Sequence, residues 1–443
     1  MSRPRKQKPR PSNDITLEIA EVAPGGDGVA IVAHQGERRA VFVRGAAPGD
    51  RIEAQVDFRS RPARGQLSRV LDAGPDRVEP ACPHTLRCGG CNWMQIASDA
   101  QTRIHVEHLR GALPETWREH PVQSVRATTA LRYRTRARLH VRASGGRAIV
   151  GMHAPSSHEP VEVDACAVLH PTLERARLEL APHFEGAHGT GEVEMALGPL
   201  SDDDAARGHV LAVRWSGALP ADVFARFERS IGETNLRGVS IVCGEATRPA
   251  IIGDPTPWMS GADGAPLQLA VGGFAQASEE GNLLLARRVA ELAASALAAV
   301  QNAHIVELYA GAGNFTVLLA RHGQVVAVES HAGGCRAAQA NLRARSIEGT
   351  KVVETDASTY ALPKSLHLLV LDPPRTGARA VCEQVAALRN PPRFILYVSC
   401  DLATLGRDLR TLSPHYRPRT IEAFELFPQT SHLETVVLLE RAR

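Results

Sequence analysis

The sequence has no apolar run that approaches the 18 residues needed for a membrane-spanning helix. Residues 1–12 contain no apolar stretch, so we expect no secretory signal and a cytoplasmic protein. A net charge of +3 is too small to indicate a nucleic-acid partner by itself. Charged residues (22%) and hydrophobic residues (44%) are near globular averages, which excludes a largely disordered chain. At 443 residues, two or three domains are expected.

A disulfide framework is not expected, because eight cysteines occur in a chain without an export signal. Cys82, Cys88 and Cys91 follow the spacing C-x5-C-x2-C, and Cys166 lies far downstream. Four thiols in such a pattern can bind zinc or a [4Fe–4S] cluster, and the spacing does not separate the two. The sequence therefore predicts a metal centre.

The N-terminal part is predicted to hold a disordered basic tail over residues 1–13, followed by a small β-barrel over residues 14–72. Short β-branched segments broken by Gly and Pro favour an OB-like barrel. On such a barrel, basic side chains commonly follow a nucleic-acid backbone, although a solvated charged face is the alternative. The arginines concerned are Arg59, Arg61, Arg64 and Arg69.

The most distinctive feature of the predicted central domain, residues 73–265, is a strand with alternating arginines at 132–142. A period of two places the first four arginines on one face of the strand. Their mutual repulsion would be relieved by a polyanion, so phosphate binding is the preferred interpretation. These residues are Arg132, Arg134, Arg136 and Arg138.

The C-terminal part, residues 266–443, alternates between helix and strand patterns and predicts a doubly wound α/β domain. A Leu/Ala-rich helix is expected over 279–300. Two antiparallel strands near the C-terminus are expected to close the sheet. Strands are predicted at 305–309, 325–328, 351–354, 366–371, 394–399, 423–427 and 432–439.

A glycine-rich loop at 307–316 predicts a nucleotide-cofactor site. Gly311 and Gly313 would let the backbone approach a ligand closely at the point where a strand passes into a helix. No third glycine completes a dinucleotide fingerprint, so S-adenosylmethionine (SAM) is favoured over NAD. Glu329, at the end of the next strand, is placed to hydrogen-bond a ribose diol.

Three further residues indicate covalent chemistry on a weakly activated carbon. Asp372 ends a strand in Asp-Pro-Pro-Arg, where the prolines stiffen the loop. Cys400 lies between a strand and a helix, where the helix dipole is expected to lower the thiol pKa and make it a nucleophile. Glu434 is the candidate base. Such a set suits uracil, whose carbon 5 becomes nucleophilic once a thiolate adds to carbon 6.

Together these motifs resemble the SAM-dependent RNA 5-methyluridine methyltransferases, in the iron–sulfur-containing bacterial branch that modifies 23S rRNA. The resemblance covers nearly the whole chain after Pro11. It implies a class I (Rossmann-like) methyltransferase domain, an N-terminal TRAM domain and a monomer acting on RNA, with rRNA favoured over tRNA. The implied [4Fe–4S] ligands are Cys82, Cys88, Cys91 and Cys166. The implied SAM contacts are Gln276, Tyr309, Asn314, Glu329, Asp356 and Asp372, with Cys400 as nucleophile and Glu434 as proton acceptor.

Two positions depart from the family motifs: Ser278 and Asp401 stand where Asn is usual. Alternative functions are a tRNA 5-methyluridine methyltransferase, an amino-group RNA methyltransferase that would not need Cys400, and a non-catalytic RNA-binding protein. RNA 5-methylcytosine enzymes typically carry a Pro-Cys motif, which Ser399-Cys400 does not fit.

Overall fold

The computed structural model describes residues 14–155, 157–201 and 207–442, and the predicted basic tail, residues 1–13, lies outside them. Within these ranges no helix is both long and apolar enough to cross a membrane. The chain divides into two compact units. One comprises residues up to Ile104 together with Gln429–Ser431, and the other comprises His105–Pro428 together with His432–Arg443.

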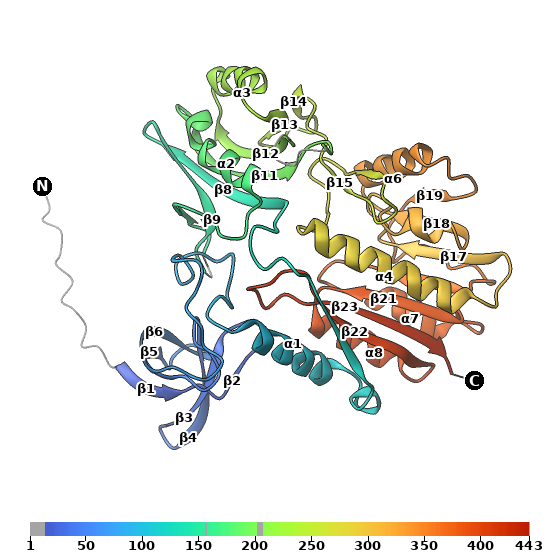
Figure 1. Cartoon of the computed structure of the whole chain (residues 1–443), viewed down its shortest axis with the longest axis horizontal. Helices are drawn as coiled ribbons and strands as arrows, with labels where there is room; N and C mark the ends of the chain where they lie inside the picture. The colour runs from blue at the N-terminus through green and yellow to red at the C-terminus, as the bar shows by residue number, and fades with distance from the viewer. Residues whose placement is uncertain (1–13, 156, 202–206, 443) are drawn as a thin grey trace, which may run out of the picture. The chain divides into compact units, whose positions relative to one another are not determined.

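The N-terminal unit is built on a six-stranded sheet with the order β1-β5-β6-β4-β3-β2 (Figure 1). Its pairs are antiparallel except β4 with β6, which are parallel. Alternate residues of the strands point inward and bury a small apolar core that includes Leu17, Val41 and Ile52. The strands are β1 (Asp14–Glu18), β2 (Glu21–Val22), β3 (Gly28–His34), β4 (Glu37–Val43), β5 (Arg51–Asp57) and β6 (Ala63–Asp72).

Three of the four arginines predicted at the edge of this sheet bind acidic side chains of the same unit. Arg59 pairs with Asp57, Arg64 with Asp27, and Arg69 with Glu53 through two hydrogen bonds. Exposed pairs of this kind contribute little to stability. They do reduce the net positive charge that the sheet presents to an RNA backbone.

One ion pair in this unit is buried, and its loss is expected to destabilise the protein strongly. The fully buried Asp50 carboxylate accepts hydrogen bonds from the Arg77 guanidinium at 2.7–3.0 Å and from the Gly74 N–H. We expect Asp50→Ala to lower the free energy of unfolding by about 3–5 kcal/mol, because it leaves a mostly buried guanidinium unpaired. The measurement is chemical denaturation. Asp72→Ala, which breaks an exposed pair with Arg51, is the control and should cost at most about 1 kcal/mol.

The segment after β6 has little regular structure until α1 (Ser98–Ala112), which is followed by a 3₁₀ turn at Glu115–Trp117. This irregular stretch carries three of the four candidate metal-binding cysteines. Its packing rests on fully buried Trp93 and on Ile96, which contact Val22 and Ala47 of the preceding segment.

The second unit contains a seven-stranded sheet with the order β10-β9-β8-β11-β12-β13-β14, in which only β12 and β13 are parallel. Two helices and a 3₁₀ turn lie with it, and Phe184, Trp215 and Phe227 fill the core. The strands are β8 (Arg136–Ser144), β9 (Arg147–His153), β10 (Pro160–Val161), β11 (His188–Leu197), β12 (His209–Ala218), β13 (Leu236–Cys243) and β14 (Ala250–Gly253). The helices are α2 (Pro171–Leu178), η2 (Ala181–Phe184) and α3 (Ala221–Glu233).

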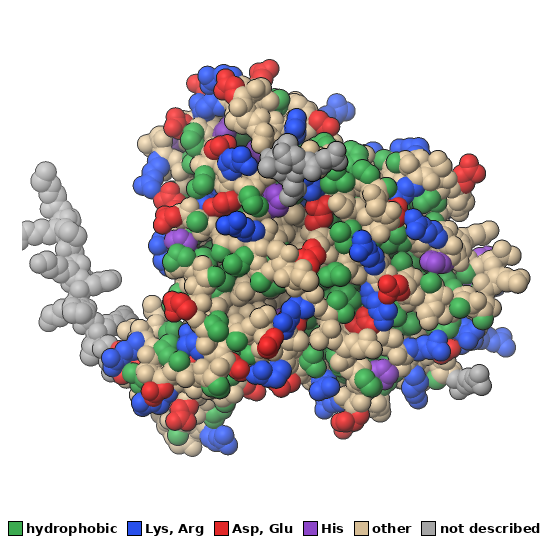
Figure 2. Space-filling view, viewed as in Figure 1, with side chains coloured by type: hydrophobic (Ala, Val, Ile, Leu, Met, Phe, Trp, Pro, Cys, Tyr) green, Lys and Arg blue, Asp and Glu red, His purple; other side chains and the backbone are tan. Residues whose placement is uncertain are grey.

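The four arginines of the predicted strand are not arranged as expected. β8 begins only at Arg136, and Arg132 has a left-handed backbone (φ 57°), so the first part of the motif does not continue the strand. Arg136 pairs with Glu194 of the neighbouring strand β11, and Arg138 lies 3.8 Å from Glu192. Carboxylates across the sheet therefore balance these two charges, and no polyanion is needed to do so. Figure 2 likewise shows basic and acidic side chains intermingled on the visible surface.

The second sheet of this unit has eight strands in the order β19-β18-β17-β20-β21-β23-β22-β7. Strands β19 to β21 are parallel, and β23 reverses direction next to β21. The strands are β7 (Val122–Arg126), β17 (Ala303–Leu308), β18 (Gly323–Glu329), β19 (Lys351–Glu354), β20 (Leu368–Leu371), β21 (Phe394–Ser399), β22 (Tyr416–Glu425) and β23 (Glu434–Arg441). A separate two-stranded sheet pairs β15 (Trp258–Ser260) with β16 (Pro266–Gln268).

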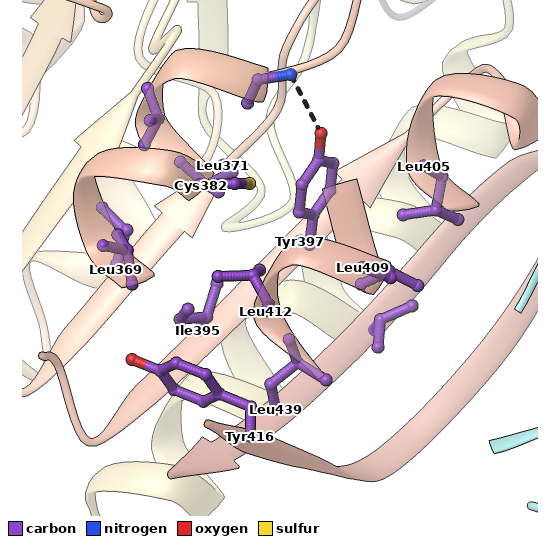
Figure 3. Close-up of a cluster of buried hydrophobic side chains, with 14 of the residues drawn as sticks. Leu369, Leu371, Cys382, Ile395, Tyr397, Leu405, Leu409, Leu412, Tyr416 and Leu439 are labelled. Carbon is purple, nitrogen blue, oxygen red and sulfur yellow. Dashed lines mark hydrogen bonds between the residues drawn. The ribbon is translucent and has the colours of Figure 1, made fainter. Parts of the chain in front are cut away.

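Helices cover both faces of the eight-stranded sheet. One core packs α1, α7 (Arg379–Ala387) and α8 (Leu402–Leu412) against the sheet, and Figure 3 shows Tyr397 and Leu409 within it. The other packs α4 (Glu279–Leu297), α5 (Thr316–Leu319) and α6 (Ala332–Ala344) on the opposite face. The predicted doubly wound α/β arrangement is confirmed in this part of the chain.

Strand β7 was not predicted in this sheet. It comes from the range assigned to the central domain and pairs in parallel with β22 at the sheet edge. Residues 105–428 also form one compact unit. The domain boundaries at residues 72 and 265 therefore stay predictions.

Candidate active site

The candidate site residues meet at one edge of the eight-stranded sheet, because they follow the carboxyl ends of its parallel strands. Tyr309 follows β17, Glu329 ends β18, Asp356 comes shortly after β19, Asp372 follows β20, and Cys400 follows β21. This edge is where ligands bind in open α/β sheets. Local sequence patterns thus predicted residues that the topology brings together.

Glu434 reaches the same edge from an antiparallel strand. Thr435 of β23 pairs with Ser399 of β21, so the residue before Thr435 lies beside the residue after Ser399, Cys400. Glu434 is only 4% exposed, and its Oε2 atom has no hydrogen-bond partner. The neighbouring Gln276 side chain opposes the effect of burial and lowers the pKa of Glu434. A buried carboxylate with an unsatisfied oxygen at a ligand edge is suited to accept a proton from a substrate.

Burial changes the proton affinities of the three central groups. It raises the pKa of Glu434 to about 8, with Asp372 adding to the effect, and the pKa of Asp372 to about 7. Burial also raises the pKa of the Cys400 thiol to about 12, and the neighbouring Glu434 and Asp372 carboxylates add to this. The expectation of a lowered thiol pKa is therefore wrong. Desolvation and two carboxylates outweigh the nearby helix end.

Arg375 is a site residue that the sequence interpretation missed. Its positive charge favours the ionised forms of both Cys400 and Glu434, opposing the effect of burial on each pKa. It lies in the Asp-Pro-Pro-Arg loop, whose Thr376 carbonyl accepts a hydrogen bond from Arg407. Thr404 Oγ1 donates to the Arg375 carbonyl at 3.1 Å. The sequence did contain an indication of this role, because Arg375 is part of the same Asp-Pro-Pro-Arg motif as Asp372.

Two buried residues, Tyr397 and Asp408, hold the end of this loop at Ala378. The Tyr397 hydroxyl donates to Asp408 Oδ2 at 2.7 Å. It also accepts a hydrogen bond from the Ala378 N–H, drawn as the dashed line in Figure 3. The Ala378 N–H also donates to Asp408 Oδ2. Because α8 follows Cys400 directly, these bonds tie the Asp372 loop to the helix that begins next to the thiol.

The cofactor loop shows the backbone strain and open space expected of a ligand cradle. Tyr309 adopts φ 66°, a conformation that non-glycine residues rarely take. A Cβ atom at Gly311 would meet no heavy atom within 4 Å, so the space beside the backbone is open. The Glu329 carboxylate accepts hydrogen bonds from the Gly311 N–H at 2.9 Å and the His331 N–H at 2.6 Å. The residues present therefore fit an adenosyl ligand.

Other predicted cofactor residues border this loop. Asn314 exchanges hydrogen bonds with Asn282 of α4, at 2.8 and 3.3 Å. Asp356 is exposed and accepts from the backbone and hydroxyl of Ser358, which hold its pKa below the usual value. Gln276 lies against Glu434, as described above. Direct contact of these side chains with SAM stays a prediction.

Glu307 is a second residue that sequence reasoning left without a role. It is 1% exposed at the end of β17, accepts a 2.6 Å hydrogen bond from Thr316 Oγ1, and has its pKa raised to about 8 by burial, with Asp372 and Glu329 adding to the rise. The sequence indicated a special role for Glu307, because it is an acidic residue in an otherwise apolar strand.

The two departures from the family motifs are accommodated by helix capping. Ser278 is the N-cap of α4 and accepts a hydrogen bond from the Gly281 N–H. Asp401 is the N-cap of α8 and accepts one from the Thr404 N–H at 2.8 Å. Ser, Asp and Asn are all favoured N-caps, so neither change disturbs the start of its helix.

Replacing Glu329 is expected to weaken SAM binding. We expect Glu329→Gln to raise the Kd for SAM about 10-fold to 100-fold, because hydrogen bonds to a charged acceptor contribute about 1.5–3 kcal/mol. Isothermal titration calorimetry measures the change. Glu354→Gln is the matched control, because Glu354 pairs with Glu329 across β18 and β19 but is exposed. A Kd that is equal in both variants would contradict the assignment.

The candidate metal ligands lie in different parts of the chain. Cys82, Cys88 and Cys91 belong to the N-terminal unit, and Cys166 belongs to the other unit. All four are partly buried. Among the described residues there is no group of three or more His, Cys, Asp or Glu side chains arranged to hold a metal ion.

The chain is similar to known proteins over nearly its whole length. A family model described as tRNA (Uracil-5-)-methyltransferase matches residues 273–442. The 23S rRNA (uracil(1939)-C(5))-methyltransferase RlmD of Halomonas elongata is 33% identical over 96% of this chain and 89% of its own length. The RlmD of Pectobacterium atrosepticum is 31% identical over 98% of this chain and 95% of its own length.

The chain belongs to the RNA 5-methyluridine methyltransferase family. It is therefore a SAM-dependent RNA (uracil-C5)-methyltransferase. A solved structure of the family fold supports the architecture: the Pyrococcus abyssi tRNA (uracil-54, C5)-methyltransferase in complex with S-adenosyl-L-homocysteine. It superposes with a TM-score of 0.72 at 21% identity, over 96% of this chain and all of that chain.

Proposed function

We propose that this enzyme methylates carbon 5 of a uridine in 23S rRNA through a covalent bond between Cys400 and carbon 6. The observation that carries the proposal is the meeting of Cys400 and Glu434 at the sheet edge that also holds the cofactor loop. The choice of 23S rRNA rests on relatives of that activity over nearly the whole chain.

The proposed roles follow from the chemistry of the uracil ring. The Cys400 sulfur adds to carbon 6, and the electrons of the carbon 5–carbon 6 double bond move to carbon 5 and oxygen 4. When bound, SAM supplies an electrophilic methyl group and a positive sulfonium. Once carbon 5 carries the methyl group, the Glu434 carboxylate removes the proton that is still bound to carbon 5. The double bond re-forms, and the Cys400 sulfur leaves carbon 6.

The residues around these two groups prepare them for their roles. Gln276 lowers the pKa of Glu434 and so favours the carboxylate form that accepts a proton. Arg375 supplies the positive charge that favours the thiolate of Cys400. The uridine has to leave its base stack to reach this edge, because carbon 6 is inaccessible within a stacked strand.

The RNA target can be tested directly. Purified enzyme and SAM are incubated with 23S rRNA and, separately, with total tRNA, and 5-methyluridine is mapped by mass spectrometry. We expect new 5-methyluridine in 23S rRNA only, and Cys400→Ala enzyme is the control for background. Methylation of tRNA alone would favour the tRNA alternative.

We further propose that Cys82, Cys88, Cys91 and Cys166 hold a [4Fe–4S] cluster. The loop chemistry fits anionic thiolates: the Gly90 N–H lies 3.4 Å from Cys88 Sγ, and Arg44 donates to the carbonyls of Cys88 and Cys91. When bound, the cluster would link the segments of the chain that carry these four cysteines. Iron and acid-labile sulfide assays on anaerobically purified enzyme test this, and a stoichiometric zinc content would contradict it.

The domain assignment is part of the same proposal. Residues 14–72 would form a TRAM domain that contacts RNA, residues 73–265 a central domain that holds the cluster, and residues 266–443 the methyltransferase domain. The enzyme would act as a cytoplasmic monomer. The six-stranded sheet at 14–72 supports a TRAM domain. Light scattering during size-exclusion chromatography tests the oligomeric state.

A further inference from the structure

Three residues near the candidate base belong structurally to the N-terminal unit. The connection between β22 and β23 spans residues 426–433, and its middle part, Gln429–Ser431, is part of the compact unit formed by residues up to Ile104. The chain on both sides of this segment belongs to the other unit. Glu434 follows Ser431 by three residues.

Hydrogen bonds fix the segment at both of its ends. The Trp93 N–H donates to the Gln429 carbonyl at 3.0 Å, and the Gln429 N–H donates to Gln101 Oε1 at 3.1 Å. The Ser431 N–H donates to Asn92 Oδ1 at 2.9 Å, and Asn92 Nδ2 donates to Ser431 Oγ at 2.9 Å. Gln429 has φ 71°, an unfavourable conformation for a non-glycine residue that persists only where its surroundings hold it.

The residues around Asn92 hold its side chain in position to contact Ser431. Asn92 Nδ2 also donates to the Gly25 carbonyl at 3.1 Å. Gly26 has φ 94°, and a Cβ atom there would lie 1.9 Å from Asn92 Nδ2 and 3.2 Å from Ser431 Oγ. Only a glycine at this turn leaves room for the Asn92 side chain to reach Ser431.

We propose that Asn92 is a positioning residue that fixes Ser431 and thereby places the Glu434 carboxylate for proton removal. The inference rests on the proposed role of Glu434 as the base. Its physical basis is that both polar ends of the Asn92 side chain hold Ser431, so that the chain leading into β23 has one conformation. Small displacements of a catalytic group are costly, since an error near 1 Å can reduce the rate about 100-fold.

The test separates base positioning from binding and from nucleophilic attack. RNA with 5-fluorouridine at the target site forms the covalent adduct, but the fluorine on carbon 5 cannot be removed by a base. For Asn92→Ala we expect kcat on ordinary RNA to fall about 10-fold to 100-fold. The dissociation constants for RNA and SAM, and the rate of adduct formation on fluorinated RNA, should stay within twofold of the wild type. An equal loss in turnover and adduct formation, or an unchanged kcat, would overturn the proposal.

A milder variant and a control keep the result interpretable. Ser431→Ala removes only one hydrogen bond and should show the same split with a smaller loss of kcat, about threefold to tenfold. Ser68→Ala breaks an exposed hydrogen bond to Asp14 elsewhere in the same unit and should change neither rate. Hydrogen exchange of peptides covering 429–434 should rise in Asn92→Ala and not in Ser68→Ala. Unchanged exchange in Asn92→Ala would also contradict the proposal.

Glu434→Gln distinguishes failure of this inference from failure of the proposed function. Normal turnover by Glu434→Gln would remove the base on which the inference rests. Loss of turnover in Glu434→Gln with a normal kcat in Asn92→Ala would leave the base in place and overturn the positioning role alone.

Discussion

Replacing Cys400 by alanine is expected to abolish methylation, with kcat falling by roughly 10⁴-fold or more. Without the sulfur, carbon 5 of uracil has no electron density to attack a methyl group. The variant should also form no covalent complex with RNA that carries 5-fluorouridine. Both results are measured with radiolabelled SAM and denaturing gel electrophoresis.

The control for this experiment is Cys243→Ala, because Cys243 ends β13 in the other sheet of the same unit. It should retain full activity. A Cys400→Ala enzyme that still methylates RNA would exclude the covalent mechanism and favour the amino-group alternative, which has no need of a thiol.

Replacing Glu434 by glutamine is expected to stop the reaction after methyl transfer. We expect turnover to fall about 10²-fold to 10⁴-fold, as is typical for the loss of a general base. Because the Cys400 thiol is still present and methyl transfer precedes proton removal, the enzyme should accumulate bound to ordinary RNA, with the methyl group already on carbon 5. Mass spectrometry of the isolated complex detects this adduct.

The pH dependence gives an independent check of the same residue. Burial raises the pKa of Glu434 to about 8 and that of Cys400 to about 12, and both groups must be deprotonated to act. The value of kcat should therefore rise from pH 6 to pH 9 and should not level off below pH 8. Glu434→Gln should show a shallower rise, since only the thiol then titrates. A flat profile in the wild-type enzyme would contradict the raised pKa values.

A contradictory result for Glu434→Gln would be turnover at the wild-type rate. Asp372 would then be the next group to test, since it lies in the same cluster with a pKa raised to about 7 by burial. Glu307 shares the cluster but is fully buried behind Thr316, which makes it a poor candidate to reach a substrate proton.

Local chemistry made much of the methyltransferase part predictable. Apolar segments of four to six residues alternate with helical patterns there, and strands at 351–354 and 394–399 occur where the sequence predicts them. The residues placed after strands then share one edge because parallel strands all point the same way. Cys400 and Asp372 could be assigned to one site for that reason.

Several features depended on residues far apart in the chain and could not be read from local patterns. Arg136 is neutralised by Glu194, 58 residues away, through the register of β8 against β11. Cys400 was expected to ionise easily, yet burial beside Glu434 and Asp372 has the opposite effect.

The sequence by itself determined which chemical groups this enzyme carries and which of them follow strands, because turn residues, helix caps and strand periodicity act over a few neighbours. The tertiary structure decided their proton affinities, the pairing of β7 with β22, and the anchoring of Gln429–Ser431 by Asn92 and Gln101. These properties arise from burial and from hydrogen bonds between distant segments, which exist only once the chain has folded.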